Sequence, residues 1–95
     1  MAEIPHVQNP VTEYGKANGW FVRRLRWLGR VAAPDTIFAK GGVVLWVEFK
    51  DEGKPAELRQ DREHTRMRKA GMLTFVIDNV AAGRALLDRY DPDDI

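Results

Sequence analysis

The chain has 95 residues, enough for one domain, with 44% hydrophobic and 31% charged residues, a net charge of +1 and no cysteine. The absence of cysteine excludes a disulfide framework and a thiolate metal site. No apolar stretch approaches the roughly 20 residues of a membrane-spanning helix, and the N-terminus lacks the apolar segment of a signal peptide. We therefore expect an intracellular, cytoplasmic protein with no membrane partner.

The net charge hides an uneven distribution of charge along the chain. Residues 91–95 hold three of the 14 acids, so residues 1–90 carry 15 bases against 11 acids. Most of the arginines gather in two stretches, over residues 23–30 and 59–69. Guanidinium groups match the oxygens of phosphate, so nucleic acid is one candidate partner. Two solvated, basic faces are the alternative.

The first predicted element is a helix near the N-terminus. Asn9-Pro10 is typical of a helix N-cap followed by the first helical position, and Gly19 ends the helix. Glu13 lies inside it, where an acid also favours the helix dipole. Residues 1–9 and 91–95 are expected to be flexible ends of a single domain that spans residues 1–95.

Strands are predicted over three of the segments that follow. Residues 20–28 are rich in aromatic and branched side chains with interleaved arginines, and residues 34–39 form a short strand. Gly41-Gly42 supplies a tight turn that requires positive φ, which joins this strand to the next, over residues 43–50, as a β-hairpin.

The strand over residues 43–50 organises the rest of the prediction. It is apolar on both faces at its start, which favours a central strand that is covered on both sides. It ends with Glu48 and Lys50 on one face, where buried charges are costly unless they are paired, bind a metal or act on a substrate. The start of one hairpin strand lies opposite the end of the other, so we expect Asp35 beside Glu48 and Lys50.

A helix over residues 57–70 follows, and it has few apolar residues. Its inward stripe offers an amide and an imidazole rather than leucines: Gln60, His64, Met67 and Gly71. Residues 73–77 are predicted to form a buried strand and residues 80–90 a last helix. The order α-β-β-β-α-β-α indicates an α/β fold in which the basic helix makes a parallel crossover.

The expected acid pair has a definite chemistry. Two carboxylates about 4 Å apart repel by roughly 4 kcal/mol at an effective dielectric near 20, so such a pair shares a proton or binds a cation. Oxygen ligands without cysteine favour Mg²⁺ or Mn²⁺ over zinc, and Asp35, Glu48 and the main-chain carbonyl of Phe49 would suffice. Lys50 would then either orient or deprotonate a water or stabilise the charge that develops as a phosphodiester is hydrolysed. The residues leave both roles open.

These residues carry a resemblance to a known family. Pro34-Asp35 followed by Glu48-Phe49-Lys50 resembles the core motif of the PD-(D/E)xK nuclease superfamily. Three further features resemble, more narrowly, the VRR-NUC family: the Gly41-Gly42 hairpin, the helix that carries Gln60, and the run from Lys69 to Ile77. The resemblance covers roughly residues 10–90. It implies a restriction-endonuclease-like core, in which helices flank a mixed central sheet, and metal-dependent cleavage of phosphodiester bonds.

The resemblance also implies roles for single residues. Asp35 and Glu48 would be metal ligands and Lys50 the catalytic lysine, while Glu13 would be the first-helix acid that completes the site. Gln60 would contact the site or its water. Small stand-alone members, from phages and bacteria, are similar to Holliday-junction resolvases in behaving as homodimers, which implies a branched DNA substrate.

We expect one group of side chains to contact DNA: Arg24, Arg26, Arg59, Arg62, His64 and Arg66. For His64, packing against Met67 is an equal alternative. A flap or single-strand-junction nuclease of replication or repair is a further possibility for the whole chain. So are a non-catalytic DNA-binding module on the same scaffold and an assembly protein whose charges form surface networks.

Overall fold

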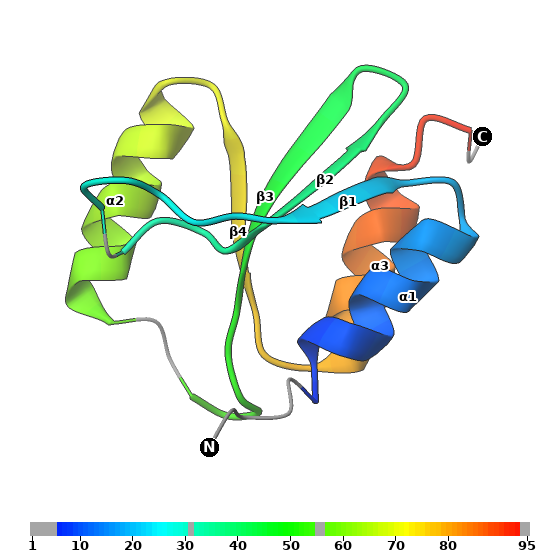
Figure 1. Ribbon diagram of the computed structural model, residues 1–95, viewed down its shortest axis with the longest axis horizontal. Helices are drawn as coiled ribbons and strands as arrows, with labels where there is room; N and C mark the ends of the chain where they lie inside the picture. The colour runs from blue at the N-terminus through cyan, green and yellow to red at the C-terminus, as the bar shows by residue number, and fades with distance from the viewer. Residues whose placement is uncertain (1–5, 31, 55–56, 94–95) are drawn as a thin grey trace.

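The computed structural model describes residues 6–30, 32–54 and 57–93, and Figure 1 shows a sheet with helices on both of its faces. α1 and α3 lie side by side on one face, while α2 lies on the other (Figure 1). The elements follow the predicted order: α1 (Gln8–Ala17), β1 (Phe21–Arg24), β2 (Thr36–Lys40), β3 (Val43–Phe49), α2 (Leu58–Lys69), β4 (Leu73–Ile77) and α3 (Val80–Tyr90). The predicted α/β fold with a mixed sheet between helices is therefore confirmed.

The strands of the sheet lie in the order β1-β2-β3-β4, antiparallel except for the parallel pair β3 and β4. A parallel pair needs a crossover, and α2 supplies it. Gly41 and Gly42 turn the chain between β2 and β3 with φ angles of 54° and 88°, as a tight hairpin requires. In this hairpin Thr36 is paired with Val47, so the residue before Thr36 lies level with Glu48.

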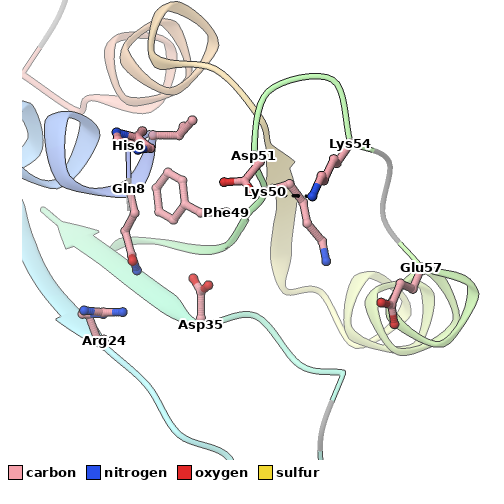
Figure 2. Close-up of a pocket in the computed structure, with 10 residues that line it drawn as sticks. His6, Gln8, Arg24, Asp35, Phe49, Lys50, Asp51, Lys54 and Glu57 are labelled. Atoms are coloured by element: carbon pink, nitrogen blue, oxygen red, sulfur yellow. Dashed lines mark ion pairs between the residues drawn. The ribbon is translucent and has the colours of Figure 1, made fainter. Parts of the chain in front are cut away.

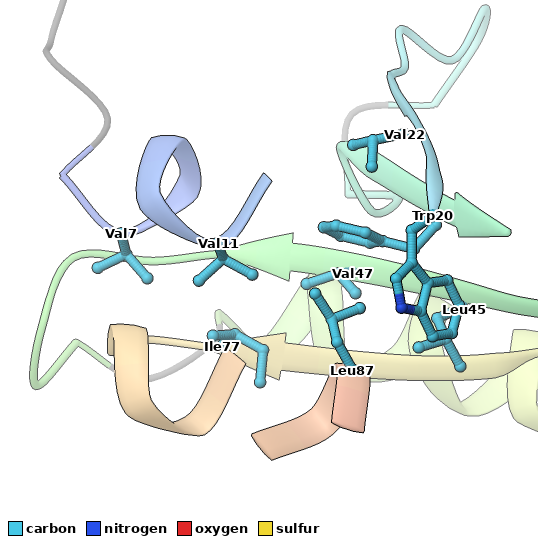
Figure 3. Close-up of a cluster of buried hydrophobic side chains, with 9 residues drawn as sticks. Val7, Val11, Trp20, Val22, Leu45, Val47, Ile77 and Leu87 are labelled. Carbon is cyan, nitrogen blue, oxygen red and sulfur yellow. The ribbon is translucent and has the colours of Figure 1, made fainter. Parts of the chain in front are cut away.

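The core lies between the sheet and the α1–α3 face, as Figure 3 shows. Alternation along β3 turns Leu45 and Val47 into this layer, where they are 0% and 1% exposed. A glycine lets the two helices approach closely, because a Cβ atom on Gly83 would lie 2.5 Å from Cγ2 of Val11. The buried members of the core are Val7, Val11, Trp20, Val22, Phe38, Leu45, Val47, Ile77 and Leu87.

The layer under α2 is polar instead. The buried residues of α2 are Gln60, His64 and Met67, as the inward stripe predicted, whereas Gly71 is exposed and ends the helix with a φ of 86°. Glu48, on the α2 face of β3, is also buried. In the described ranges no helix has both the length and the apolar character needed to cross a membrane.

The boundaries of α1, β1 and β2 differ from the prediction by two or more residues. α1 begins at Gln8, and Val7 rather than Asn9 is its N-cap. Pro10 is tolerated inside the first turn because the first four N–H groups of a helix have no partner within it. β1 ends at Arg24 instead of Leu28, because its partner strand β2 begins at Thr36, which is paired with Arg24.

The predicted flexible ends are described only in part. Residues 8 and 9 are helical, and residues 91–93 follow α3. Lys40 binds this segment through an ion pair of 2.9 Å with Asp91. Residues 1–5 and 94–95 lie outside the described residues.

Candidate active site

The end of the β2–β3 hairpin brings the predicted acids and lysine together. Asp35 lies level with Glu48, because the next residues along the hairpin, Thr36 and Val47, are paired. The pKa of the Glu48 carboxyl is raised to about 7, chiefly by burial and then by the nearby Asp35 carboxylate, while the Lys50 ammonium opposes the shift. Glu48 is only 8% exposed. The three charges therefore act on one another at the rim of the sheet, as the sequence predicted.

Asp35 is held by neighbours on both sides. The pKa of its carboxyl is raised, because burial outweighs three influences that lower it: a hydrogen bond from the Thr36 hydroxyl, one from the Phe49 backbone N–H, and the charge of Arg24. The Thr36 hydroxyl donates to Asp35 Oδ1 at 2.8 Å and accepts from Gln8 Nε2 at 2.8 Å. Asp35 is thus a half-buried carboxylate with several donors around it.

A pocket of about 570 Å³ opens beside these residues. Figure 2 shows the Asp35 carboxylate, the Gln8 amide and the Arg24 guanidinium directed towards a shared space, with Lys50 extending from the end of β3. The lining of this pocket includes side chains from the start of α1, the end of β1, the hairpin and the loop before α2: Gln8, Arg24, Asp35, Phe49, Lys50 and Glu57. The pocket is therefore polar and open to a charged ligand.

Glu13 lies apart from this pocket. It is exposed on α1 and lines a separate pocket of about 320 Å³, which shares Gln8 and Arg24 with the larger one. Gln60 is buried, and its Oε1 accepts from the Glu57 backbone N–H at 3.0 Å in a capping box at the start of α2. Its amide oxygen therefore has a structural partner, while within the described residues its amide nitrogen has none and can donate elsewhere.

His64 is the most enclosed of the predicted residues, with 0% of its surface exposed. Within the described residues neither ring nitrogen has a hydrogen-bond partner. Burial, and then the charge of Arg68, lower the pKa of the ring, which is therefore neutral at physiological pH. In this structure the ring has no exposed edge with which to touch DNA, and both His64 and Met67 lie on the buried face of α2.

The predicted DNA-contacting arginines are all exposed. Arg59, Arg62 and Arg66 repeat at three and four residues along α2, opposite its buried stripe, so they share an outer face. Arg24 is at the end of β1 and lines the main pocket. Two of the α2 arginines have acidic neighbours, since Arg66 forms an ion pair of 3.1 Å with Glu63 and Arg59 one of 4.0 Å with Glu57.

The donor set suits a hard divalent cation. Among the described residues no group of three or more His, Cys, Asp or Glu side chains is placed to hold a metal ion. Mg²⁺, however, commonly takes one or two carboxylates and fills its other positions with water and substrate oxygens. The Phe49 carbonyl lies on the same edge of β3 as its N–H, which faces Asp35. Asp35, Glu48 and this carbonyl therefore fit such an ion.

One buried residue of the site was not predicted. Gln8 is 4% exposed and reaches Asp35 through Thr36. It belongs to the buried face of α1, whose other members, Val11, Thr12 and Gly15, follow it at helical spacing. This spacing would have identified Gln8 if the helix had been predicted to begin two residues earlier, at Gln8 instead of Pro10.

The sheet order and the hairpin that carries the acids and lysine define a restriction-endonuclease-like α/β core. This is the fold class of metal-dependent nucleases.

Comparisons with known proteins agree with this class. A solved structure titled "VRR_NUC domain" is 37% identical in sequence and superposes with a TM-score of 0.81, covering 90% of this chain and 94% of its own. A second, titled "VRR_NUC domain protein", is 20% identical and has the same fold, with a TM-score of 0.76 over 95% of this chain and 92% of its own. No protein-family model and no curated protein matches the chain. The chain belongs to the VRR-NUC family of nuclease-type domains.

Proposed function

We propose that the protein is a divalent-metal-dependent endonuclease that hydrolyses phosphodiester bonds in branched DNA and acts as a homodimer. The observation that carries this proposal is the pair of acids at the hairpin end, where burial and the Asp35 charge raise the pKa of Glu48 to about 7. An acid pair in this position is unfavourable unless a cation or a proton neutralises it. Lys50 lines the same pocket as Asp35.

In this proposal Asp35, Glu48 and the Phe49 carbonyl hold Mg²⁺ or Mn²⁺. The ion, when bound, polarises the phosphate and lowers the pKa of a water molecule. Lys50 donates a hydrogen bond either to that water or to a phosphate oxygen. The amide nitrogen of Gln60, which has no hydrogen-bond partner within the described residues, is a candidate contact to the water. Glu13 is a candidate acid that acts from the adjoining pocket.

The branched substrate and the homodimer rest on the similarity of small stand-alone family members to junction resolvases. Two sites related by a two-fold axis would cut opposing strands symmetrically. The exposed arginines at the pocket, after β1 and on α2, including Arg24, Arg26 and Arg62, would bind the phosphates of the arms.

A panel of labelled DNA tests the activity and the substrate together. Linear, flap, splayed-arm and four-way-junction DNA are incubated with Mg²⁺, Mn²⁺ or EDTA. We expect paired, symmetric nicks in the four-way junction with either metal and none in EDTA. Asp35→Asn should bind the junction but cut it roughly 100-fold more slowly or worse, since metal contacts contribute several kcal/mol to such reactions.

Each other outcome of this panel has a definite meaning. A preference for flaps would assign the protein to another replication or repair step, and binding without cutting would indicate a non-catalytic module. Sedimentation velocity of the free protein checks the homodimer. Cleavage by Asp35→Asn at the rate of the unmodified protein would contradict the assigned site.

The arginines of α2 give a separate prediction about binding. Changing Arg59, Arg62 or Arg66 to alanine should weaken binding to every DNA in the panel and reduce the slope of log K against log salt by about 1 for each lost phosphate contact. Arg89→Ala is the matched control, since Arg89 is exposed on α3, on the other face of the sheet. Fluorescence anisotropy at several salt concentrations measures both quantities. An equal loss in Arg89→Ala would show that only total charge matters.

A further inference from the structure

A chain of buried hydrogen bonds connects α1 to the candidate metal ligand. Gln8 Nε2 donates to Thr36 Oγ1 at 2.8 Å, and the Thr36 hydroxyl donates to Asp35 Oδ1 at 2.8 Å. Gln8 is 4% exposed and Thr36 is 0% exposed, so the bond between them is shielded from solvent, while the bond to Asp35 is part-buried at the edge of the pocket. Two elements therefore meet through one continuous path, from the first turn of α1 through the start of β2 to the pocket.

The direction of this chain is fixed by the chemistry of its members. An amide nitrogen can only donate, so Thr36 Oγ1 accepts from Gln8. The hydroxyl has a single proton, which is then directed to Asp35 Oδ1. Successive hydrogen bonds of one direction polarise each other, and a bond to a carboxylate is among the stronger kinds. Asp35 Oδ1 thus accepts the hydrogen bond from Thr36, and the series of bonds from Gln8 does not engage the second oxygen of the carboxylate.

Packing alone does not require polar groups at these two positions. Thr36 and Phe38 project from β2 into the apolar layer under α1 and α3, where Val11 and Leu87 are also buried. Valine has nearly the shape of threonine and would fill this place without a hydroxyl to satisfy. The evident effect of the polar pair Gln8 and Thr36 is therefore to fix the side chain of Asp35.

We propose that Gln8 and Thr36 are positioning residues, which hold the Asp35 carboxylate in the orientation that a divalent cation at the hairpin end requires. This inference rests on the proposed function, because it assumes that Asp35 is a ligand. Hydrogen-bonding partners of metal ligands commonly set the geometry of the ligand, and their loss typically lowers metal affinity about 10- to 100-fold. Neither residue touches the cation or the substrate in this proposal.

The test compares Thr36→Val, which removes only the hydroxyl, with Thr36→Ser, which keeps it. Calorimetric titration of each protein with Mn²⁺ should give an affinity about 10- to 100-fold lower for Thr36→Val. Thr36→Ser should restore the affinity to nearly that of the unmodified protein. Gln8→Leu should fall between them, since it removes the outer member of the chain but leaves the Thr36 bond in place.

A second measurement reports the orientation without any metal. Three-bond couplings of the Asp35 β-protons should indicate one rotamer in the unmodified protein and in Thr36→Ser, and averaging between rotamers in Thr36→Val. If Thr36→Val does not fold, Gln8→Leu and Thr36→Ser carry the same comparison. A purely structural role would lower thermal stability in these variants but leave the Asp35 couplings unchanged.

The outcomes separate this inference from the proposed function. If the unmodified protein binds no Mn²⁺, the proposed function fails, and the positioning role towards a cation fails with it. If the unmodified protein binds Mn²⁺ and Thr36→Val binds it equally well, the positioning role alone is overturned. Equal damage in Thr36→Ser and Thr36→Val would also overturn it, because the hydroxyl would then not be the cause.

Discussion

Replacing Lys50 with alanine is expected to slow DNA cleavage by about 10²- to 10³-fold, the range found when one donor to a developing charge is removed from an enzyme. Lys50 follows β3 directly and lines the pocket beside the acid pair, and its charge opposes the raised pKa of Glu48. Its loss should leave DNA affinity within a few-fold of the original, because the exposed arginines supply most of the phosphate contacts. Cutting and binding should therefore separate in this variant.

Lys54→Ala is the matched control for this prediction. Lys54 lines the same pocket and carries the same charge, but it is exposed and forms an ion pair of 3.7 Å with Asp51. It should cut DNA at a rate close to that of the unmodified protein. The measurement is a single-turnover cleavage rate at saturating metal, with binding followed separately by anisotropy. An equal loss in both variants would mean that Lys50 contributes only net charge to the pocket, and no loss in Lys50→Ala would contradict its catalytic role.

The hairpin shows why much of the site was predictable from the sequence. A continuous apolar run over residues 43–47 is followed by Glu48 and Lys50, and the Gly41-Gly42 turn fixes how the two strands pair. Once the turn is fixed, side-chain alternation leaves one register in which the apolar face is buried. Asp35 then lies opposite Glu48 without any further assumption. The parallel crossover followed in the same way from the length of chain between β3 and β4.

The polar partners under and beside the acids were harder to predict. Gln8 escaped notice because the Asn9-Pro10 pair is so typical of a helix start, although a proline is equally tolerated later in the first turn. Gln60 was identified as an inward residue, yet its bond to the Glu57 backbone depends on cap geometry rather than on spacing. His64 was placed on the same stripe, but complete burial with both ring nitrogens unpaired within the described residues is a tertiary outcome. A sequence pattern gives the face of a helix and not the partners that meet it.

The acid pair also predicts how the protein's stability responds to pH. The pKa of Glu48 is raised from its ordinary value of 4.5 to about 7 in the folded protein, first by burial and then by Asp35. The folded state therefore binds this proton more tightly than the unfolded state does. The stabilisation from protonated Glu48 is fully present below about pH 4.5 and is lost as the pH rises through about 7. Above that pH the ionised carboxyl destabilises the fold.

Glu48→Gln should therefore make the metal-free protein more stable at pH 8, while removing a ligand that we propose for catalysis. The shift in the pKa of Glu48 corresponds to roughly 3 kcal/mol of unfolding free energy as an upper value. A gain of about 1 kcal/mol in this free energy already raises the Tm of a domain this small by several degrees. The gain should become small as the pH falls to 4.5, the ordinary pKa of the carboxyl, and should vanish below it, where the carboxyl is protonated in both states. Thermal unfolding of both proteins between pH 4.5 and 8 in EDTA measures it.

The control for this prediction is Glu52→Gln, which changes the same charge on an exposed residue of the loop after β3 and should leave the Tm nearly unchanged at both pH values. Adding Mg²⁺ or Mn²⁺ supplies the complementary measurement. A cation that binds only the folded state stabilises it, so the unmodified protein should gain more from the metal than Glu48→Gln does. A Glu48→Gln protein that is less stable than the original at pH 8, or equally changed at pH 4.5, would contradict the strained acid pair. The nuclease site would then lose its main physical argument, because an unstrained Glu48 has no need of a cation.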